Sequence, residues 1–304
     1  MNVPKHEMDA LKLLEASQKY RILRRLDIMQ HPGLTGKPIT GKTRRVGLCI
    51  DTETTGFNFS DDVIIELGIV AFEYDAMTGE ISRIVDTYSG FEDPCRPLDP
   101  EVTAVTGITD DMLAGQSLDD AAVGKIVSQA SLCFCHNCKF DRSFLERRFP
   151  EFEKLPFACT MSQIDWKNEL VTSRTLEYLL YKCGACFIDA HRALNDAEGL
   201  LGLLLENLPV SKLSVFKTVL ENARKPSFKI MAYNSAYSAK DSLRDRKYHW
   251  EPGGDGKIKT WWTVVSEKDL DNEITFLNNI AYTNGTDDVE IIKIDAFNRF
   301  SRRE

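Results

Sequence analysis

The segment 46–56, VGLCIDTETTG, is the feature that most constrains the fold of this chain. Its apolar residues at 46, 48 and 50 alternate with smaller ones, a spacing that predicts a buried strand leading into Asp51. Side chains two positions apart on a strand share a face, so we expect Asp51 and Glu53 to point to the same side. Two like charges this close need a counter-charge, which a divalent metal ion supplies. The segment therefore predicts a strand that delivers acidic ligands to a pocket.

Other apolar runs predict the remainder of a sheet. The runs 63–74 and 81–88 predict two strands joined by a turn at 77–80, which together with the first strand make a three-stranded meander. The segment LCFC at 132–135 predicts a further buried strand. Helices are expected within 99–113, 117–130 and 142–149, and from residue 175 onward. The order predicts an α/β fold.

Two more acids and a histidine occupy positions suited to a site. Asp141 follows the strand 132–135 and precedes the expected helix 142–149, so it can cap that helix, bind a metal ion, or do both. Asp196 begins the leucine stripe of the last helix, and a carboxylate on a buried stripe needs a partner such as a metal ion. His191, at the entry to the same helix, has the chemistry of a general base beside four acids.

These segments resemble the three motifs of the DEDDh 3′→5′ exonucleases, in the branch that includes the proofreading subunit of bacterial replicative DNA polymerase. The motifs are DTETTG at 51–56, HNCKFD at 136–141 and HRALND at 191–196. The resemblance covers roughly residues 45–209. It implies a ribonuclease H-like fold, a mixed sheet flanked by helices.

The resemblance also implies a site and a reaction. Two divalent ions, Mg²⁺ or Mn²⁺, would be held by the four acids Asp51, Glu53, Asp141 and Asp196, and His191 would be the general base. The pocket for the terminal nucleotide would be lined by Thr54, Thr55, Gly56, Asn137 and Phe140, although Phe140 has core packing as its alternative. The expected reaction releases nucleoside 5′-monophosphates from DNA 3′ ends, with single strands as the expected form of the substrate.

Two other functions stay open at this point. One is a 3′→5′ exoribonuclease, since contacts to the 2′-hydroxyl decide between RNA and DNA. The other is a catalytically inactive relative that binds nucleic acid, against which the presence of all four acids and the histidine argues. The segment 160–166 also resembles branch members that are not polymerase subunits, so a polymerase partner is not implied.

The charge distribution agrees with a polyanionic substrate. The net charge of −8 argues against nucleic acid, but residues 1–45 hold ten Lys or Arg against four Asp or Glu, and residues 221–260 hold nine against five. Basic segments beside an acidic, metal-binding core suit an enzyme that acts on nucleic acid. A solvated surface with no partner is the alternative reading of either segment. Residues 1–44 are expected to form an amphipathic helix at 6–29 and a basic linker, followed by the exonuclease domain at 45–210.

The remainder of the chain predicts a second domain. Residues 211–226 are expected to be a helical linker, and residues 227–304 a small α+β domain with the order βαββαβ, which permits a ferredoxin-like arrangement. Trp250, Trp261 and Trp262 lie among basic residues, a mixture found in single-strand binders, so the domain is a candidate nucleic-acid-binding accessory. Core packing of these tryptophans is the alternative.

Cysteines and hydropathy bear on metal type and location. Eight cysteines without a secretory signal indicate reduced thiols, and a zinc site at Cys133, Cys135 and Cys138 with the pair at 183 and 186 is a weaker alternative. No apolar run approaches the length that spans a bilayer. The sequence therefore predicts a cytoplasmic protein without a membrane partner.

Overall fold

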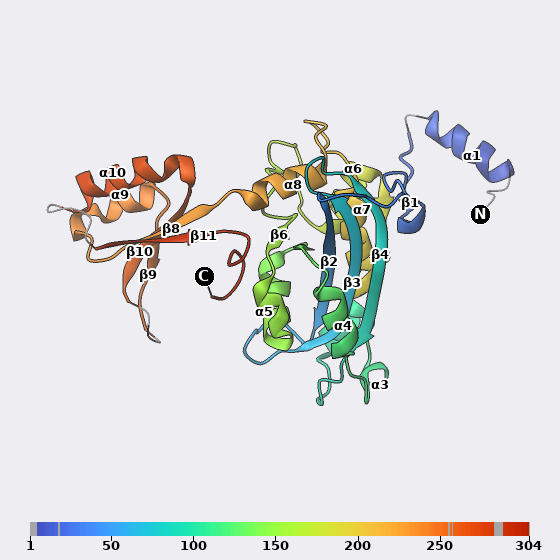
Figure 1. The fold of residues 1–304 in the computed structure, drawn as a ribbon, viewed down its shortest axis with the longest axis horizontal. Helices are drawn as coiled ribbons and strands as arrows, with labels where there is room; N and C mark the ends of the chain where they lie inside the picture. The colour runs from blue at the N-terminus through green and yellow to red at the C-terminus, as the bar shows by residue number, and fades with distance from the viewer. Residues whose placement is uncertain (1–4, 18, 255, 257, 283–287, 304) are drawn as a thin grey trace. The chain divides into compact units, whose positions relative to one another are not determined.

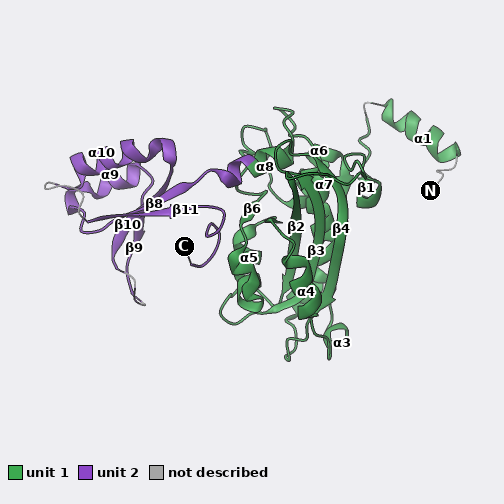
Figure 2. Ribbon diagram, viewed as in Figure 1, with its two compact units in different colours: residues 1–220 green, residues 221–304 purple. Residues whose placement is uncertain are grey.

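The chain forms two compact units. The computed structural model describes residues 5–17, 19–254, 256, 258–282 and 288–303. Unit 1 is Met1–Leu220 and unit 2 is Glu221–Glu304, shown green and purple in Figure 2. Among the described residues, no helix is both long and apolar enough to cross a membrane.

Unit 1 is built on a five-stranded mixed sheet (Figure 1). Its strands are β2 (Arg44–Thr54), β3 (Ile64–Asp75), β4 (Ile81–Phe91), β5 (Leu132–Cys135) and β6 (Phe157–Cys159), in the order β4-β3-β2-β5-β6. The first three form the predicted antiparallel meander, and β5 and β6 continue the sheet parallel to β2. The arrangement confirms the predicted mixed sheet, and it places β2 at the centre, where both of its faces are covered.

Helices cover this sheet. They are α2 (Pro100–Thr106), α3 (Asp110–Leu113), α4 (Asp120–Val127), α5 (Cys138–Arg148), α6 (Leu176–Gly184) and α7 (Ala193–Leu204), with a 3₁₀ turn η2 (Pro150–Lys154) after α5. Helix α7 packs on β2 and β3, and α6 packs on α7. Helix α5 begins four residues before the predicted start at 142, because Asn137 takes a left-handed conformation with φ 58° and turns the chain from β5 directly into the helix. The prediction that Asp141 can cap α5 is therefore wrong, since it lies inside the first turn.

The predicted helix at 6–29 is wrong in its second half. Helix α1 (Lys5–Glu15) has no buried residue, and the chain after it includes a short strand β1 (Arg24–Arg25) and a 3₁₀ turn η1 (Ile28–Gln30). Strand β1 pairs with β7 (Cys186–Phe187), and the Arg24 N–H donates to the carbonyl of Ala185. Tertiary pairing therefore overrides the helical spacing of residues 22–29.

The segment after η1 is also attached to the domain rather than a free linker. The Gly36 N–H donates to the Ser82 carbonyl, the Ser82 hydroxyl donates to the Lys37 carbonyl, and the Ile39 N–H donates to the buried carboxylate of Glu73. The predicted basic linker thus runs along β3 and β4, because these groups give its backbone partners.

Helix α8 (Val215–Arg224) spans the division between the units. Val215, Phe216 and Val219 are buried, and the Phe216 ring lies 5.1 Å from Tyr74 and 5.5 Å from Phe134, centroid to centroid. The predicted end of the exonuclease domain at 210 left out these residues. The apolar face of α8 completes the core of unit 1, so the predicted linker 211–226 is in part a core element.

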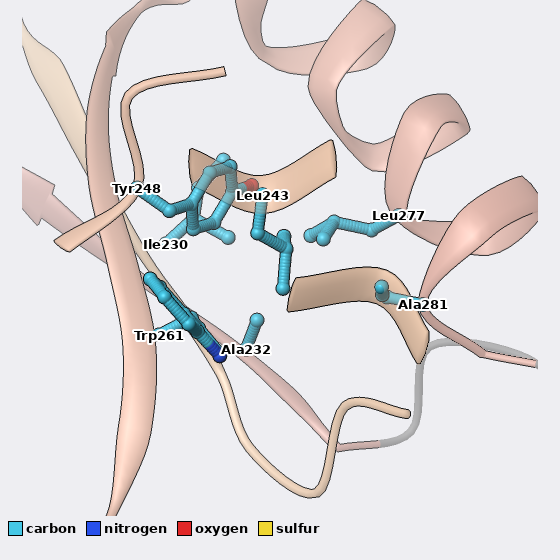
Figure 3. Packing of buried hydrophobic residues seen from close by; sticks show 8 residues of the cluster. Ile230, Ala232, Leu243, Tyr248, Trp261, Leu277 and Ala281 are labelled. Carbon is cyan, nitrogen blue, oxygen red and sulfur yellow. The ribbon is translucent and has the colours of Figure 1, made fainter. Parts of the chain in front are cut away.

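Unit 2 has the predicted order βαββαβ. Its elements are β8 (Ser227–Ala232), η3 (Tyr237–Ala239), α9 (Lys240–Asp245), β9 (His249–Glu251), β10 (Thr260–Ser266), η4 (Glu267–Asp269), α10 (Leu270–Ile280) and β11 (Val289–Ile294). The antiparallel sheet has the order β11-β8-β10-β9, the split arrangement expected for a ferredoxin-like domain. Ile230, Leu243, Trp261 and Leu277 meet in its core (Figure 3).

Candidate active site

Strand β2 brings two acids to one face of the sheet. Asp51 and Glu53 are half-buried, whereas Thr52 between them is buried on the opposite face. The ladder with β3 shifts register between Glu53 and Thr54, so the regular strand ends just beyond the acid pair. The alternation read from the sequence therefore sets the direction of both carboxylates.

Helix α7 brings the third acid. In the part of the chain that the structure describes, Asp51, Glu53 and Asp196 are the one group of acids, histidines or cysteines that could hold a metal ion, with ligand atoms within 4.8 Å of one another. The alternative zinc site does not form: all eight cysteines are free thiols, and none belongs to such a group among the described residues.

The start of α7 is held close to β3 by two features. Gly68 has no side chain, and a Cβ placed there would lie 2.2 Å from the carbonyl carbon of Ala193. The buried Glu66 carboxylate accepts the Ala193 N–H at 3.0 Å and pairs with the Arg192 guanidinium at 2.9 Å. Because Asp196 lies one turn further along α7, these contacts also fix the position of its carboxylate relative to β2.

Asp141 reaches the same region from α5. Its carboxylate accepts the Thr52 backbone N–H at 3.1 Å and the Thr52 hydroxyl at 2.9 Å. Asp141 is buried and its charge acts on Asp51, although it is not part of the three-acid group. Thr52 therefore links the strand that carries two acids to the helix that carries the fourth.

His191 lies on the loop that enters α7. Its backbone is left-handed, with φ 65°, and its side chain is exposed. It precedes Arg192, the N-cap residue of α7, whose N–H donates to the Asp196 carboxylate at 3.1 Å. The histidine lies beside the acids, with its side chain open to solvent.

The acids are hard to ionise together in the metal-free protein. Burial and the neighbouring carboxylates raise the pKa of Asp51 well above its usual value. Burial, followed by the charges of Asp196 and Glu66, raises the pKa of Glu53 to about 8. Burial likewise raises the pKa of Asp141 to about 7 and that of Asp196 to about 6. A bound cation would offset this repulsion, so the donor set fits a divalent metal ion.

A cavity of about 550 Å³ opens over these groups. It is lined by all five predicted catalytic residues and by two predicted substrate residues, Asn137 and Phe140. Phe140 is half-buried, and its ring packs against Phe144 at 4.9 Å, so the alternative of core packing holds alongside its place in the cavity.

Thr54, Thr55 and Gly56 do not line this cavity. The Thr54 hydroxyl donates to the Gly56 carbonyl at 2.6 Å, and the Thr55 hydroxyl donates to the Asp62 carboxylate at 2.8 Å. A Cβ on Gly56 would lie 2.5 Å from that carboxylate. These three residues build the turn after β2, and a direct substrate contact for them stays a prediction.

The sequence analysis gave no role to three residues in or near this cavity. Arg174 is the single lysine or arginine among the described lining residues, and it was missed because it lies outside the three motifs. His136 begins the second motif. Its ring forms hydrogen bonds with the Thr160 hydroxyl at 2.8 Å and the Arg174 carbonyl at 2.6 Å, so it connects segments that border the cavity. Phe57 is 92% exposed and lies 5.9 Å from Phe140, ring to ring.

Comparison with known proteins adds the family. The sequence model of the exonuclease family, RNase_T, matches residues 48–204. DNA polymerase III subunit epsilon of Pasteurella multocida is 34% identical over 125 residues, which are 39% of this chain and 45% of that protein. DNA polymerase III PolC-type of Clostridium perfringens is 30% identical over 159 residues, which are 51% of this chain and 10% of that protein. The chain therefore spans less than half of either relative.

Solved structures with a similar arrangement are also exonucleases. Exonuclease X in complex with 5′ overhanging duplex DNA is 25% identical, with a TM-score of 0.38, covering 52% of this chain and 89% of that chain. Escherichia coli exonuclease I in complex with a dA16 oligonucleotide is 16% identical, with a TM-score of 0.48, covering 73% of this chain and 63% of that chain.

Proposed function

This chain belongs to the exonuclease family, among the DnaQ-like 3′→5′ exonucleases, and we propose that it removes nucleotides from the 3′ ends of DNA in a divalent-metal-dependent reaction of the DEDDh type. The observation that carries the proposal is the convergence of Asp51, Glu53 and Asp196 within 4.8 Å, in a cavity that also contains a histidine.

The metal requirement follows from the acids. Asp51, Glu53 and Asp196 would hold one divalent ion, Mg²⁺ or Mn²⁺, and Asp141 with Asp51 would serve a second. When bound, two such ions stabilise the charge on the phosphate that is attacked and on the oxygen that leaves. The protein contributes the position of each carboxylate, which β2, α5 and α7 fix independently.

His191 is proposed to be the general base. The His191 side chain is exposed, and its backbone has a left-handed conformation. The imidazole can therefore approach a water molecule that attacks the terminal phosphodiester. The imidazole takes the proton from that water, whose oxygen forms a bond to phosphorus as the bond to the 3′ oxygen of the preceding nucleotide breaks. The leaving 3′ oxygen then takes a proton from solvent. The products are a nucleoside 5′-monophosphate and a chain with a new 3′-hydroxyl.

The terminal nucleotide is proposed to lie over Asn137 and Phe140. The Phe140 ring and the exposed Phe57 ring offer flat surfaces on which bases can stack. Arg174, the single lysine or arginine among the described lining residues, is proposed to bind a phosphate of the substrate. DNA is favoured as substrate because the epsilon and PolC-type relatives, at 34% and 30% identity, both carry DNA polymerase III in their names.

The test is degradation of matched 5′-labelled DNA and RNA oligonucleotides in Mg²⁺, Mn²⁺ or EDTA. The proposal expects a ladder of DNA shortened from the 3′ end in either metal, none in EDTA, and none with Asp51→Asn. Asp111→Asn, an exposed acid outside the site, is the matched control and should cut as the wild type does. Faster trimming of RNA would assign the exoribonuclease function instead, and binding without cutting would assign the inactive relative.

A further inference from the structure

Unit 2 contains a cavity outside the active site. Its volume is about 660 Å³, larger than that of the catalytic cavity. It is bounded by the end of β8, the segment 234–237, helix α9, and the adjoining parts of β9 and β10. Neither the three motifs nor the proposed reaction uses it.

The described lining of this cavity is basic. Lys240, Arg244 and Lys259 contribute to it, and none of the described lining residues is an aspartate or a glutamate. Arg244 is 3.7 Å from Asp241, but both side chains are more than half exposed, so this pair neutralises little. The cavity therefore favours an anion.

The same lining offers aromatic surface. Trp250 is 50% exposed and packs on the buried Trp261 with ring centroids 5.2 Å apart. Trp261 is anchored in the core of unit 2 (Figure 3). Trp250 therefore rests on a fixed support. Tyr237 is 86% exposed and lies under the Lys240 ammonium at 5.6 Å. Exposed rings held beside cations are the arrangement with which proteins bind single-stranded nucleic acid, because bases stack on rings while cations meet phosphates.

We propose that this cavity is a second nucleic-acid site, which binds at least one nucleotide of a single strand through Trp250 and Tyr237 and its phosphates through Lys240, Arg244 and Lys259. An acidic peptide would use the cations but not the exposed rings.

The experiment measures binding without cutting. The full chain carrying Asp51→Asn is titrated in EDTA into a fluorescein-labelled thymidine 15-mer, and the dissociation constant is followed by anisotropy between 50 and 300 mM salt. Lys240→Ala/Lys259→Ala is compared with the matched pair Lys268→Ala/Lys293→Ala, which are exposed cations of unit 2 outside the cavity. Circular dichroism of each variant checks folding.

The proposal expects the cavity pair alone to weaken binding and to lower the salt slope by about 1.4, because each phosphate contact on a single strand contributes about 0.7. Trp250→Ala should weaken binding by roughly 5- to 160-fold, the range for one stacked base. On an oligonucleotide with abasic sites, wild type and Trp250→Ala should bind alike, while Trp250→Phe should retain part of the affinity for the normal strand.

Three results would overturn the proposal. The first is an equal salt slope for the cavity pair and the control pair. The second is a binding defect of Trp250→Ala that persists on the abasic strand. The third is complete displacement of the strand by polyglutamate, to the same extent in wild type and Trp250→Ala. Wild-type hydrolysis of the p-nitrophenyl ester of thymidine 5′-monophosphate, measured separately in Mn²⁺, tests the active site alone. Its absence would remove the proposed function and leave the binding result standing.

Discussion

Replacing Glu53 by glutamine should stabilise the metal-free protein at alkaline pH. Burial and nearby acids raise the pKa of Glu53 from 4.5 to about 8 in the folded state. The folded protein therefore holds this proton more tightly than the unfolded chain does. The stability gained from protonated Glu53 is fully present below pH 4.5 and is lost as the pH rises toward 8. Glutamine resembles the protonated acid at every pH, so the variant escapes this loss.

The size of the effect follows from the two pKa values. At about 1.36 kcal/mol per pH unit, the interval from 4.5 to about 8 corresponds to a loss of roughly 5 kcal/mol for an isolated group. Neighbouring acids take up protons as well and share the repulsion, so we expect Glu53→Gln to gain about 2 to 5 kcal/mol at pH 8.5. At pH 5 the difference should be below about 1 kcal/mol.

The assay is urea unfolding in EDTA, followed by hydrogen exchange of peptides from β2 and β3, which report on unit 1. Glu80→Gln, at an exposed glutamate, is the matched control and should change stability little at either pH. Adding Mg²⁺ should stabilise the wild type more than Glu53→Gln, because the ion binds the ionised carboxylate. A variant no more stable than wild type at pH 8.5 in EDTA would refute the account of the acid cluster.

Three further variants test the site. His191→Ala should lower kcat by about 10²- to 10⁴-fold while Mg²⁺ binding measured by calorimetry stays as in wild type; a large loss of Mg²⁺ binding would contradict its role as a base. Gly68→Ala should cost about 1 to 3 kcal/mol in urea unfolding and weaken Mg²⁺ binding, since the new Cβ meets Ala193 at 2.2 Å. Gly124→Ala, where a Cβ meets nothing within 4 Å, is its control and should not destabilise. Arg174→Ala should raise KM for DNA more than it lowers kcat in steady-state kinetics, whereas a defect in kcat alone would remove it from substrate binding.

The sequence predicts best what depends on local spacing. The period-2 alternation in 46–54 correctly assigns the faces of Asp51, Thr52 and Glu53, and the apolar runs locate the meander. The leucine stripe places Asp196 on a buried face of α7. These features follow from side-chain geometry along one element.

What the sequence misses depends on contacts between distant segments. Three features of the site arise only when separate elements meet. They are the hydrogen bond from Thr52 to Asp141, the hydrogen bond from Ala193 to Glu66, and the position of Arg174 in the cavity. Likewise, residues 22–29 have helical spacing, yet the pairing of β1 with β7 decides their conformation. The tryptophans of unit 2 differ in burial. Trp261 packs in the core, whereas Trp250 is half exposed and stays a candidate for nucleic-acid binding.

The three-acid group can form only after most of unit 1 has been synthesised. The β2–β3 hairpin emerges early and carries Asp51 and Glu53, but Asp196 joins them only after α7 has been made and has docked over Gly68. A nascent or truncated chain that ends before α7 lacks Asp196, and the repelling carboxylates that remain hold a metal ion poorly. Chains that end before α7 should therefore not cut nucleic acid.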